Sequence, residues 1–291
     1  MSKLPKFLKI KTAARPEIVS QNREKLKKLG LATVCQEAKC PNIGECWSQN
    51  TATFMIMGDT CTRGCKFCHV KTGMPDQLDP LEPHKVAIAI KKMQLEYVVI
   101  TSVDRDDLPD QGAQHFAATI SQIKKTNPGI KVEVLIPDFR GQTDLLDIII
   151  GAQPEVIAHN IETTKELTPE VRDFRAKYQQ SLKVLSHIKS NSPNTIIKTS
   201  IMLGFGETDQ QLHKTFQDLN QINLDILTFG QYLQPSQKQI KVREFIKPEK
   251  YITLCKQAQH AGIKLAVGSP MMRSSYKAHN YYNQLTKSEC N

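Results

Sequence analysis

The sequence predicts an α/β fold, a partial (β/α)6-type TIM-like barrel with an extension at each end. Short runs rich in β-branched and other apolar residues recur at 53–57, 97–102, 131–136, 156–161, 195–203, 226–233 and 263–267. Segments with helical spacing separate most of these runs. Strands that alternate with helices form parallel sheets through right-handed crossovers, so repeated units curl into a doubly wound sheet or a barrel.

The segments between the predicted strands carry apolar side chains at the spacing of a helix face. Three such faces consist of Val86, Ile90 and Met93, of Leu182, Leu185 and Ile188, and of Leu212, Phe216 and Leu219. Residues three or four apart lie on the same side of a helix, so each face is expected to pack against the sheet.

This alternation of predicted strands and helices divides the chain into three regions. The barrel is expected to span residues 51–267, where strands and helices alternate. Residues 1–50 lie outside the rhythm and are predicted to be an N-terminal extension that contains three of the cysteines. Residues 268–291 are predicted to form a C-terminal tail, which includes the sequence Arg-Ser-Ser-Tyr at 273–276.

The composition indicates a globular, cytoplasmic protein. Apolar residues make up 40% and charged residues 23% of the 291 residues, which excludes a disordered chain. No apolar run approaches the roughly 18 residues that a membrane helix needs, and Lys3, Lys6 and Lys9 prevent an apolar signal-peptide core. The net charge of +10 indicates either an ordinary solvated surface or a field that attracts acidic partners. No recognition motif indicates nucleic acid.

Six of the eight cysteines fall into two triplets with unlike spacing. The triplets are Cys35, Cys40 and Cys46, spaced C-x4-C-x5-C, and Cys61, Cys65 and Cys68, spaced C-x3-C-x2-C. Disulfides are disfavoured in a reducing cytosol, and the second spacing is too short and uneven for a zinc finger. An iron–sulfur cluster is therefore favoured over zinc or disulfides, and three thiolates on a four-iron cube leave one iron open.

Polar and glycine-rich clusters follow successive predicted strands. In a barrel, the loops after the strands meet at one end and carry the functional residues. Asn160 and Glu162 are therefore predicted to bind a cofactor, with a structural role as the alternative. Gly204 and Gly206 are predicted to let the backbone approach the same cofactor closely.

The second triplet stands in a recognisable context. The sequence Cys61-Thr-Arg-Gly-Cys65-Lys-Phe67-Cys68 follows a predicted strand and has an aromatic residue before its last cysteine. It resembles the signature of the radical S-adenosylmethionine (radical SAM) enzymes. The resemblance implies a 4Fe–4S cluster on the three cysteines, Phe67 beside the cofactor, and a full or partial (β/α) barrel. In that family the open iron binds S-adenosylmethionine, and one electron from the cluster releases a 5′-deoxyadenosyl radical.

Further motifs narrow the resemblance to the lipoyl synthases. They are the first cysteine triplet, Arg-Ser-Ser-Tyr, and the segments 100–108, 137–141, 159–160, 204–208 and 230–236. The resemblance implies a second, auxiliary 4Fe–4S cluster in the N-terminal extension, bound by Cys35, Cys40, Cys46 and Ser275. A serine oxygen holds iron more weakly than a thiolate, which suits a cluster that is consumed as the sulfur source. Cys61, Cys65, Cys68 and Ser275 are the implied catalytic residues.

The reaction implied is the insertion of two sulfur atoms at C6 and C8 of an octanoyl chain attached to a lysine of a lipoyl carrier domain. An unactivated CH2 group has no acidic proton, so a carbon radical rather than a base must start the reaction. The implied partners are octanoylated E2 subunits of 2-oxoacid dehydrogenases, the H protein of glycine cleavage, and reduced ferredoxin or flavodoxin. Neither nucleic acid nor a membrane is an expected partner.

Two other functions are compatible with some of these motifs. A radical sulfur-inserting enzyme similar to biotin synthase would not need the first triplet or the Arg-Ser-Ser-Tyr sequence. A two-cluster electron carrier would be small and would fill each cluster with four cysteines. This chain is large and leaves each triplet one cysteine short.

Overall fold

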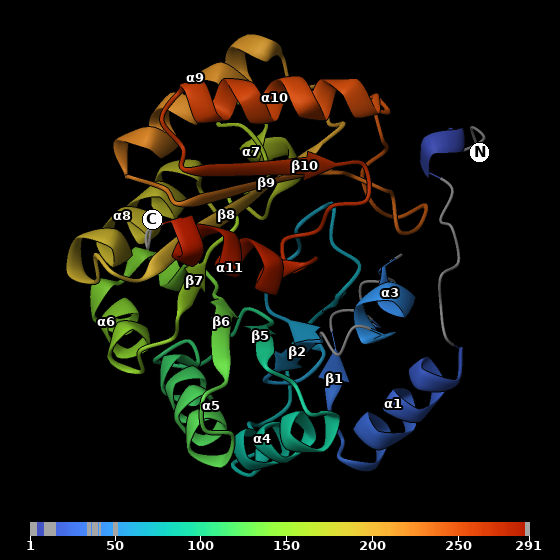
Figure 1. The fold of residues 1–291 in the computed structure, drawn as a ribbon, viewed down its shortest axis with the longest axis vertical. Helices are drawn as coiled ribbons and strands as arrows, with labels where there is room; N and C mark the ends of the chain where they lie inside the picture. Colours follow the sequence, from blue (N-terminus) through green and yellow to red (C-terminus); the bar gives the residue numbers. More distant parts are fainter. Residues whose placement is uncertain are drawn as a thin grey trace.

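The computed structural model describes residues 5–8, 16–33, 36, 40, 42–48 and 52–288. One curved sheet has the strand order β1-β2-β5-β6-β7-β8-β9-β10 (Figure 1). Its strands are β1 (Ala32–Thr33), β2 (Thr53–Ile56), β5 (Tyr97–Ser102), β6 (Lys131–Leu135), β7 (Val156–Ala158), β8 (Ile196–Leu203), β9 (Ile226–Gln231) and β10 (Leu265–Ser269). Neighbouring strands run parallel except β1, which is antiparallel to β2. Within the described chain, β1 and β10 are unpaired edges, so the barrel is open.

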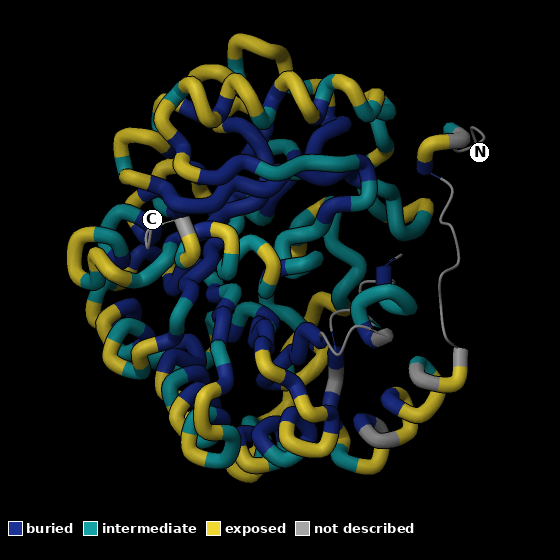
Figure 2. The backbone as a smooth tube through the Cα atoms, viewed as in Figure 1, coloured by how far each residue is buried: buried dark blue, intermediate teal, exposed yellow. Residues whose placement is uncertain are grey.

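Helices cover the outer, convex face of this sheet. They are α4 (Glu82–Met93), α5 (Ala113–Thr126), α6 (Thr143–Gly151), α8 (Tyr178–Asn191), α9 (Asp209–Gln221) and α10 (Pro248–His260), with the short α7 (Thr168–Val171) and η2 (Phe139–Gly141) in loops. The predicted apolar faces of α4, α8 and α9 are buried against the strands, while the opposite faces are exposed (Figure 2). The predicted open α/β barrel is therefore confirmed. Among the helices described, none is long and apolar enough to cross a bilayer.

The C-terminal helix α11 (Ala278–Ser288) lies on the inner side of the sheet (Figure 1). It packs in two apolar clusters, one with β5 and one with β9 and β10. The clusters consist of Tyr97, Val99, Ala278 and Tyr282, and of Ile226, Leu265 and Leu285. Side chains alternate along a strand, so the β5 residues of the first cluster share a face with Thr101, which lines the cavity described below. Helix α11 thus fills the amino-terminal end of the barrel.

A buried ion pair occupies the barrel interior and joins β6 to β8. Lys198 Nζ lies 2.7 Å from Glu133 Oε1, and both residues are 1% exposed. The Tyr97 hydroxyl donates to Glu133 Oε2 at 2.5 Å. Because each charge has a partner, burial of the pair is tolerated.

The N-terminal segment contributes α1 (Pro16–Lys28) and α3 (Ile43–Ser48), besides the edge strand β1 and the short turn η1 (Lys6–Leu8). The region around α3 is bonded to the C-terminal tail. Asn42 Nδ2 donates to the Met271 carbonyl oxygen at 2.7 Å, and the Tyr276 hydroxyl donates to Glu45 Oε2 at 2.8 Å. Two segments from opposite ends of the sequence therefore meet beside the open barrel.

Candidate active site

The carboxyl ends of the strands surround a cavity of about 320 Å³. Strand ends contribute side chains and backbone from Thr101, Leu135, Ser200 and Gly230. The loop with the second cysteine triplet covers one side, and residues 272–274 of the tail cover another. The cavity lies where parallel barrels concentrate their functional loops, as the strand-end clusters in the sequence predicted.

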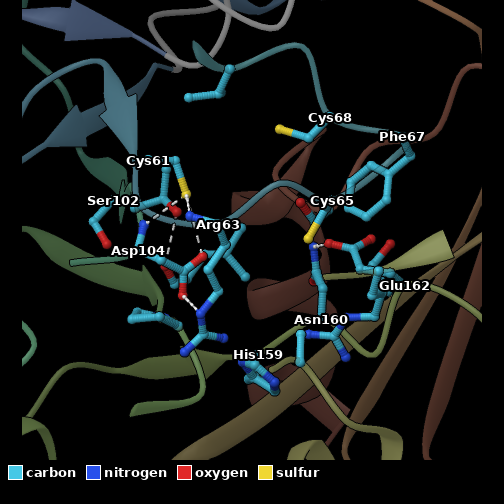
Figure 3. A pocket seen from close by; sticks show the side chains of 18 of the residues that line it. Cys61, Arg63, Cys65, Phe67, Cys68, Ser102, Asp104, His159, Asn160 and Glu162 are labelled. Carbon is cyan, nitrogen blue, oxygen red and sulfur yellow. Dashed lines mark hydrogen bonds and ion pairs between the residues drawn. The ribbon is translucent and has the colours of Figure 1, made fainter. Parts of the chain in front are cut away.

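Cys61, Cys65 and Cys68 all line this cavity, and their sulfur atoms lie around one shared space (Figure 3). A two-stranded parallel pair, β3 (Thr60–Cys61) and β4 (Lys71–Thr72), closes the loop that carries them. The Cys68 N–H donates to the Cys65 carbonyl oxygen at 3.0 Å, which tightens the loop. All three cysteines are free thiols.

The surroundings of the three thiols fit a bound iron–sulfur cluster. Burial raises the pKa of Cys61 and Cys65 to about 12 and the pKa of Cys68 to about 11, so their thiolate forms need a bound cation. The N–H groups of Asp104 and Asp173 donate to Cys61 Sγ and Cys65 Sγ, each at 3.3 Å, and such bonds stabilise cluster sulfur.

A single metal ion needs several ligands that converge on one point. Within the described chain, no three His, Cys, Asp or Glu side chains are placed to bind one common ion. A four-iron cube instead takes one thiolate at each of three separate corners. Three thiols around one space match this requirement.

Arg63, between the first two cysteines of the loop, is buried in a network of carboxylates. Its Nε and Nη2 atoms donate to the two Asp106 oxygens at 2.7 and 2.9 Å. Its Nη1 and Nη2 atoms each lie 2.8 Å from an Asp138 oxygen. Arg140 and Arg175 also bind Asp106, at 2.9 and 3.3 Å. The cysteine loop is thereby fastened to the loops that follow β5 and β6.

No motif in the sequence marked Arg63 as part of the site. A signal was available: an arginine inside a cysteine loop, with aspartates after the next two strands. Asp104 lies 3.3 Å from the same guanidinium. Burial raises the pKa of Asp104 to about 6, although the charge of Arg63 opposes this shift.

Asn160 and Glu162 lie together on the cavity wall opposite Cys61, beside Cys65 (Figure 3). Asn160 Nδ2 donates to Glu162 Oε1 at 3.2 Å. Glu162 has a left-handed backbone conformation with φ of 66°, a strained conformation often found at functional sites. Burial raises the pKa of the Glu162 carboxyl.

Polar atoms without partners mark the cavity as a site for a polar ligand. Ser102 Oγ, Asn160 Oδ1 and Arg172 Nε are buried and make no hydrogen bond to the described residues. All three side chains line the cavity, and Arg172 is a second residue that the sequence analysis missed. Buried polar atoms are seldom left unsatisfied, so a ligand with complementary polar groups fits here.

His159 forms part of the cavity floor and is held as a neutral ring. Its Nδ1 lies 3.0 Å from the Ile136 carbonyl oxygen, which can only accept, so Nδ1 carries the proton. Its Nε2 accepts from the Ser181 hydroxyl at 2.8 Å, and Ser181 Oγ in turn accepts from Arg172 Nη1 at 2.8 Å. Burial lowers the pKa of His159 to about 4, so the ring stays uncharged near neutrality.

Other predicted residues have different positions relative to the cavity. Phe67 lines it and packs against an apolar cluster that includes Phe205 and Tyr232. Gly204 and Gly206 are not among the cavity-lining residues and instead pack against residues 243–244. A Cβ atom at Gly204 would lie 2.6 Å from the Glu244 carbonyl oxygen, and one at Gly206 would lie 3.0 Å from Arg243 Cδ. These glycines thus admit a neighbouring segment.

The residues predicted for the auxiliary cluster are only partly described. Cys35 lies outside the described residues, while Cys40 and Cys46 are half-buried and form no disulfide within the described chain. Arg273 and Ser274 line the cavity, and Ser275 follows them in the same turn. Burial lowers the pKa of the Arg273 guanidinium, and the neighbouring Cys40 favours its charged form.

Comparisons with known proteins identify the family. The profile of the Radical SAM superfamily matches residues 55–219. A lipoyl synthase from Myxococcus xanthus is 51% identical over 257 residues, covering 88% of this chain and 86% of that protein. The chain belongs to the lipoyl synthase family of the radical SAM superfamily. Mitochondrial lipoyl synthases of Culex quinquefasciatus and Schizosaccharomyces pombe are also 51% identical, covering 96% of this chain and 75% and 77% of those proteins.

Solved structures share the fold of this lipoyl synthase family member. SuiB of Streptococcus suis bound to S-adenosylmethionine matches with a TM-score of 0.56 and 12% identity, covering 87% of this chain and 60% of SuiB. Methylornithine synthase (PylB) also matches with a TM-score of 0.56 and 12% identity, covering 85% of this chain and 77% of that chain. At such low identity the likeness concerns the fold alone. The family places the chain among iron–sulfur enzymes that use S-adenosylmethionine.

Proposed function

We propose that this radical SAM sulfurtransferase inserts sulfur at C6 and C8 of an octanoyl chain on a carrier lysine, using an auxiliary cluster as the sulfur source. The observation that carries the proposal is one cavity bounded by the cysteine loop on one side and by residues 272–274 of the tail on the other. A radical source and a sulfur source would then face the same alkyl chain, as reaction at an unactivated carbon requires.

Cys61, Cys65 and Cys68 would hold the first 4Fe–4S cluster at the cavity. When bound, the cluster and S-adenosylmethionine supply a carbon radical that abstracts hydrogen. Asn160 and Glu162 would bind the ribose or the amino group of S-adenosylmethionine, and Phe67 would lie beside that cofactor. The Arg172 guanidinium, whose Nε has no partner in the described chain, would bind a carboxylate.

The remaining cavity wall suits an alkyl chain. Its apolar lining includes Met55, Leu135, Ile136, Met202 and Met272, from strand ends and the tail. These side chains would exclude water from the octanoyl group and hold it in position. The protein thus binds and shields the alkyl chain while the cofactor supplies the reactive group.

The auxiliary cluster would be bound by Cys35, Cys40, Cys46 and Ser275. The chain would consist of an N-terminal extension (1–50), the barrel (51–267) and a C-terminal tail (268–291). The hydrogen bonds from Asn42 to the tail and from Tyr276 to α3 support this assignment, because they join the first triplet region to the serine-bearing turn. The charge of Arg273, which lines the cavity and interacts with Cys40, would offset the negative charge of a cluster there.

One assay tests the proposed reaction. Reconstituted protein is incubated without oxygen with S-adenosylmethionine, a reductant and an octanoylated carrier-domain peptide. The expected products are 5′-deoxyadenosine and a lipoylated peptide, identified by mass. Release of 5′-deoxyadenosine without thiolated or lipoylated peptide would contradict the proposal.

A pair of serine variants tests the auxiliary ligand. Ser275→Ala is expected to retain cleavage of S-adenosylmethionine while losing sulfur insertion and the Mössbauer signal of the second cluster. Ser274→Ala is the matched control, because Ser274 is the adjacent hydroxyl and is not a proposed ligand. Full sulfur insertion by Ser275→Ala with an intact second cluster would remove Ser275 from the site.

We also propose that the substrates are octanoylated lipoyl carrier domains and that reduced ferredoxin or flavodoxin supplies the electrons. The proposed location is the cytoplasm. Several relatives are named mitochondrial. Fractionation of source cells with an antibody against the chain tests the location, and recovery in an organelle fraction would overturn it. Carrier preference is tested by comparing octanoylated E2 domains with octanoylated H protein in the assay above.

A further inference from the structure

An exposed aromatic side chain lies directly outside the cysteine loop. Phe174 is 80% exposed, although a phenylalanine gains by burial. The preceding residue, Asp173, donates its N–H to Cys65 Sγ at 3.3 Å and accepts from the Gly64 N–H at 2.9 Å. Arg175 Nη2 donates to the Thr62 carbonyl oxygen at 2.8 Å. Phe174 is therefore fixed to the backbone that carries the first two cysteines of the loop.

Around Phe174, basic side chains are more exposed than the carboxylates that pair with them. The Arg140 and Arg175 side chains are 49% and 30% exposed, whereas Asp106 and Asp173, which pair with them, are 3% and 7% exposed. Lys66 and Lys177 are exposed on the same loops. The Arg175 guanidinium also lies 5.1 Å from the centre of the Phe174 ring. We call Lys66, Phe174, Arg175 and Lys177 the basic aromatic patch.

The patch lies on the outer side of the cysteine loop, away from the cavity. Cys61, Cys65 and Cys68 line the cavity, whereas no patch residue is among its lining. Gly64 and Lys66, from the same loop, face solvent. A protein docked on the patch would thus lie behind the cysteines and leave the cavity free for cofactor and substrate.

We propose that the basic aromatic patch docks a small acidic protein that donates single electrons to the iron–sulfur cluster of the cysteine loop. In this step one electron leaves the reduced donor and reduces the cluster by one electron, while no bond forms or breaks. The basic residues of the patch would attract an acidic protein, and small interfaces are typical of transient complexes between redox proteins. The inference rests on the proposed binding of the cluster by Cys61, Cys65 and Cys68.

The test compares two triple variants with the same change in charge. The patch variant carries Lys66→Glu, Phe174→Ser and Lys177→Glu. The control variant carries Lys247→Glu, Ile252→Ser and Lys256→Glu at or on α10, where these side chains are likewise exposed. Flavodoxin hydroquinone is the protein donor and titanium(III) citrate is the small-molecule donor. Bleaching of the cluster absorbance is followed by stopped flow.

The patch variant is expected to be reduced by flavodoxin at least about tenfold more slowly than wild type, with reduction by titanium(III) unchanged. The control variant is expected to behave like wild type with both donors. Equal slowing in both variants, or none in the patch variant, would overturn the proposal. A rise in KM for the octanoylated carrier with titanium(III) would also overturn it, because the patch would then dock the carrier. Failure of wild type with titanium(III) would instead contradict the proposed cluster.

Discussion

Arg63 shows how one side chain can hold the cysteine loop in place. Ionic and hydrogen bonds from Arg63 help to hold the shape of the loop. Arg63 is 4% exposed and reaches carboxylates that follow two different strands. A bidentate guanidinium fixes direction as well as distance, which a lysine ammonium would not do.

Replacing Arg63 with alanine is expected to lower the free energy of unfolding by about 3 kcal/mol, because it leaves the buried Asp138 carboxylate without its cation. It is also expected to reduce the iron bound by the cysteine loop. Denaturant unfolding and iron analysis after reconstitution measure both effects. Arg105→Ala is the control, since Arg105 is 2% exposed and pairs with Asp107 outside the cysteine loop. Iron binding equal to wild type in Arg63→Ala would contradict this role.

The neutral His159 makes stability depend on pH in a defined window. Its pKa is lowered to about 4 in the folded protein by burial, from about 6.5 in an unfolded chain. Between these values the unfolded state binds more protons, so folding stability falls as pH drops from about 6.5 to about 4.

Wild type is expected to lose on the order of 3 kcal/mol of folding stability through His159 across this pH window. The His159→Asn variant is expected not to show this loss. The difference in unfolding free energy between wild type and His159→Asn is measured at several pH values across the window. The difference should shrink as the pH falls, because wild type loses the stability that the variant cannot lose. A difference independent of pH would show that His159 is not held neutral.

At the scale of elements, α11 and the ion pair between β6 and β8 complete the barrel interior. A sheet with two unpaired edges leaves an inner face that a closed barrel would fill with its own side chains. Here Leu285 and Tyr282 of α11 fill the amino-terminal end, and Lys198 with Glu133 lies nearer the middle. Packed side chains thus lie beneath the cavity, on the side toward the amino-terminal ends of the strands.

Replacing Lys198 with methionine is expected to cost about 3–5 kcal/mol, because Glu133 would remain buried without its cation. The double variant Lys198→Met/Glu133→Leu is expected to recover most of this loss, since two apolar side chains can pack where the pair was. Denaturant unfolding of both variants measures the difference. A double variant as unstable as the single one would show that the volume, rather than the charge, of the pair matters.

At the scale of the whole molecule, the net charge of +10 is expected to speed association with acidic proteins. The association rate with an octanoylated acidic carrier domain is expected to fall by about an order of magnitude as ionic strength rises from about 0.01 to 0.5 M. Stopped-flow fluorescence with labelled carrier measures this rate. A rate that does not change with salt would show that the charge does not steer binding.

The fold and part of the site could be predicted because their signals are local. Strand runs, helix faces and the spacing of Cys61, Cys65 and Cys68 are patterns among neighbouring residues, and the cavity contains those cysteines. The place of Asn160 and Glu162 at a strand end predicted a position at the cavity, and both residues line it. Gly204 and Gly206 also follow a strand, but they pack against residues 243–244 and do not line the cavity. A sequence pattern does not specify which way such a turn faces.

The sequence by itself thus determined the barrel, the family and the cysteine loop, since periodicity and motif spacing act over short distances along the chain. The tertiary structure decided what surrounds that loop. Arg63 binds aspartates 43 and 75 residues away, and Asn42 binds a carbonyl 229 residues away. Such contacts depend on where separate strands end in space. For the same reason, only the folded chain shows that Phe174 remains exposed behind the cysteines.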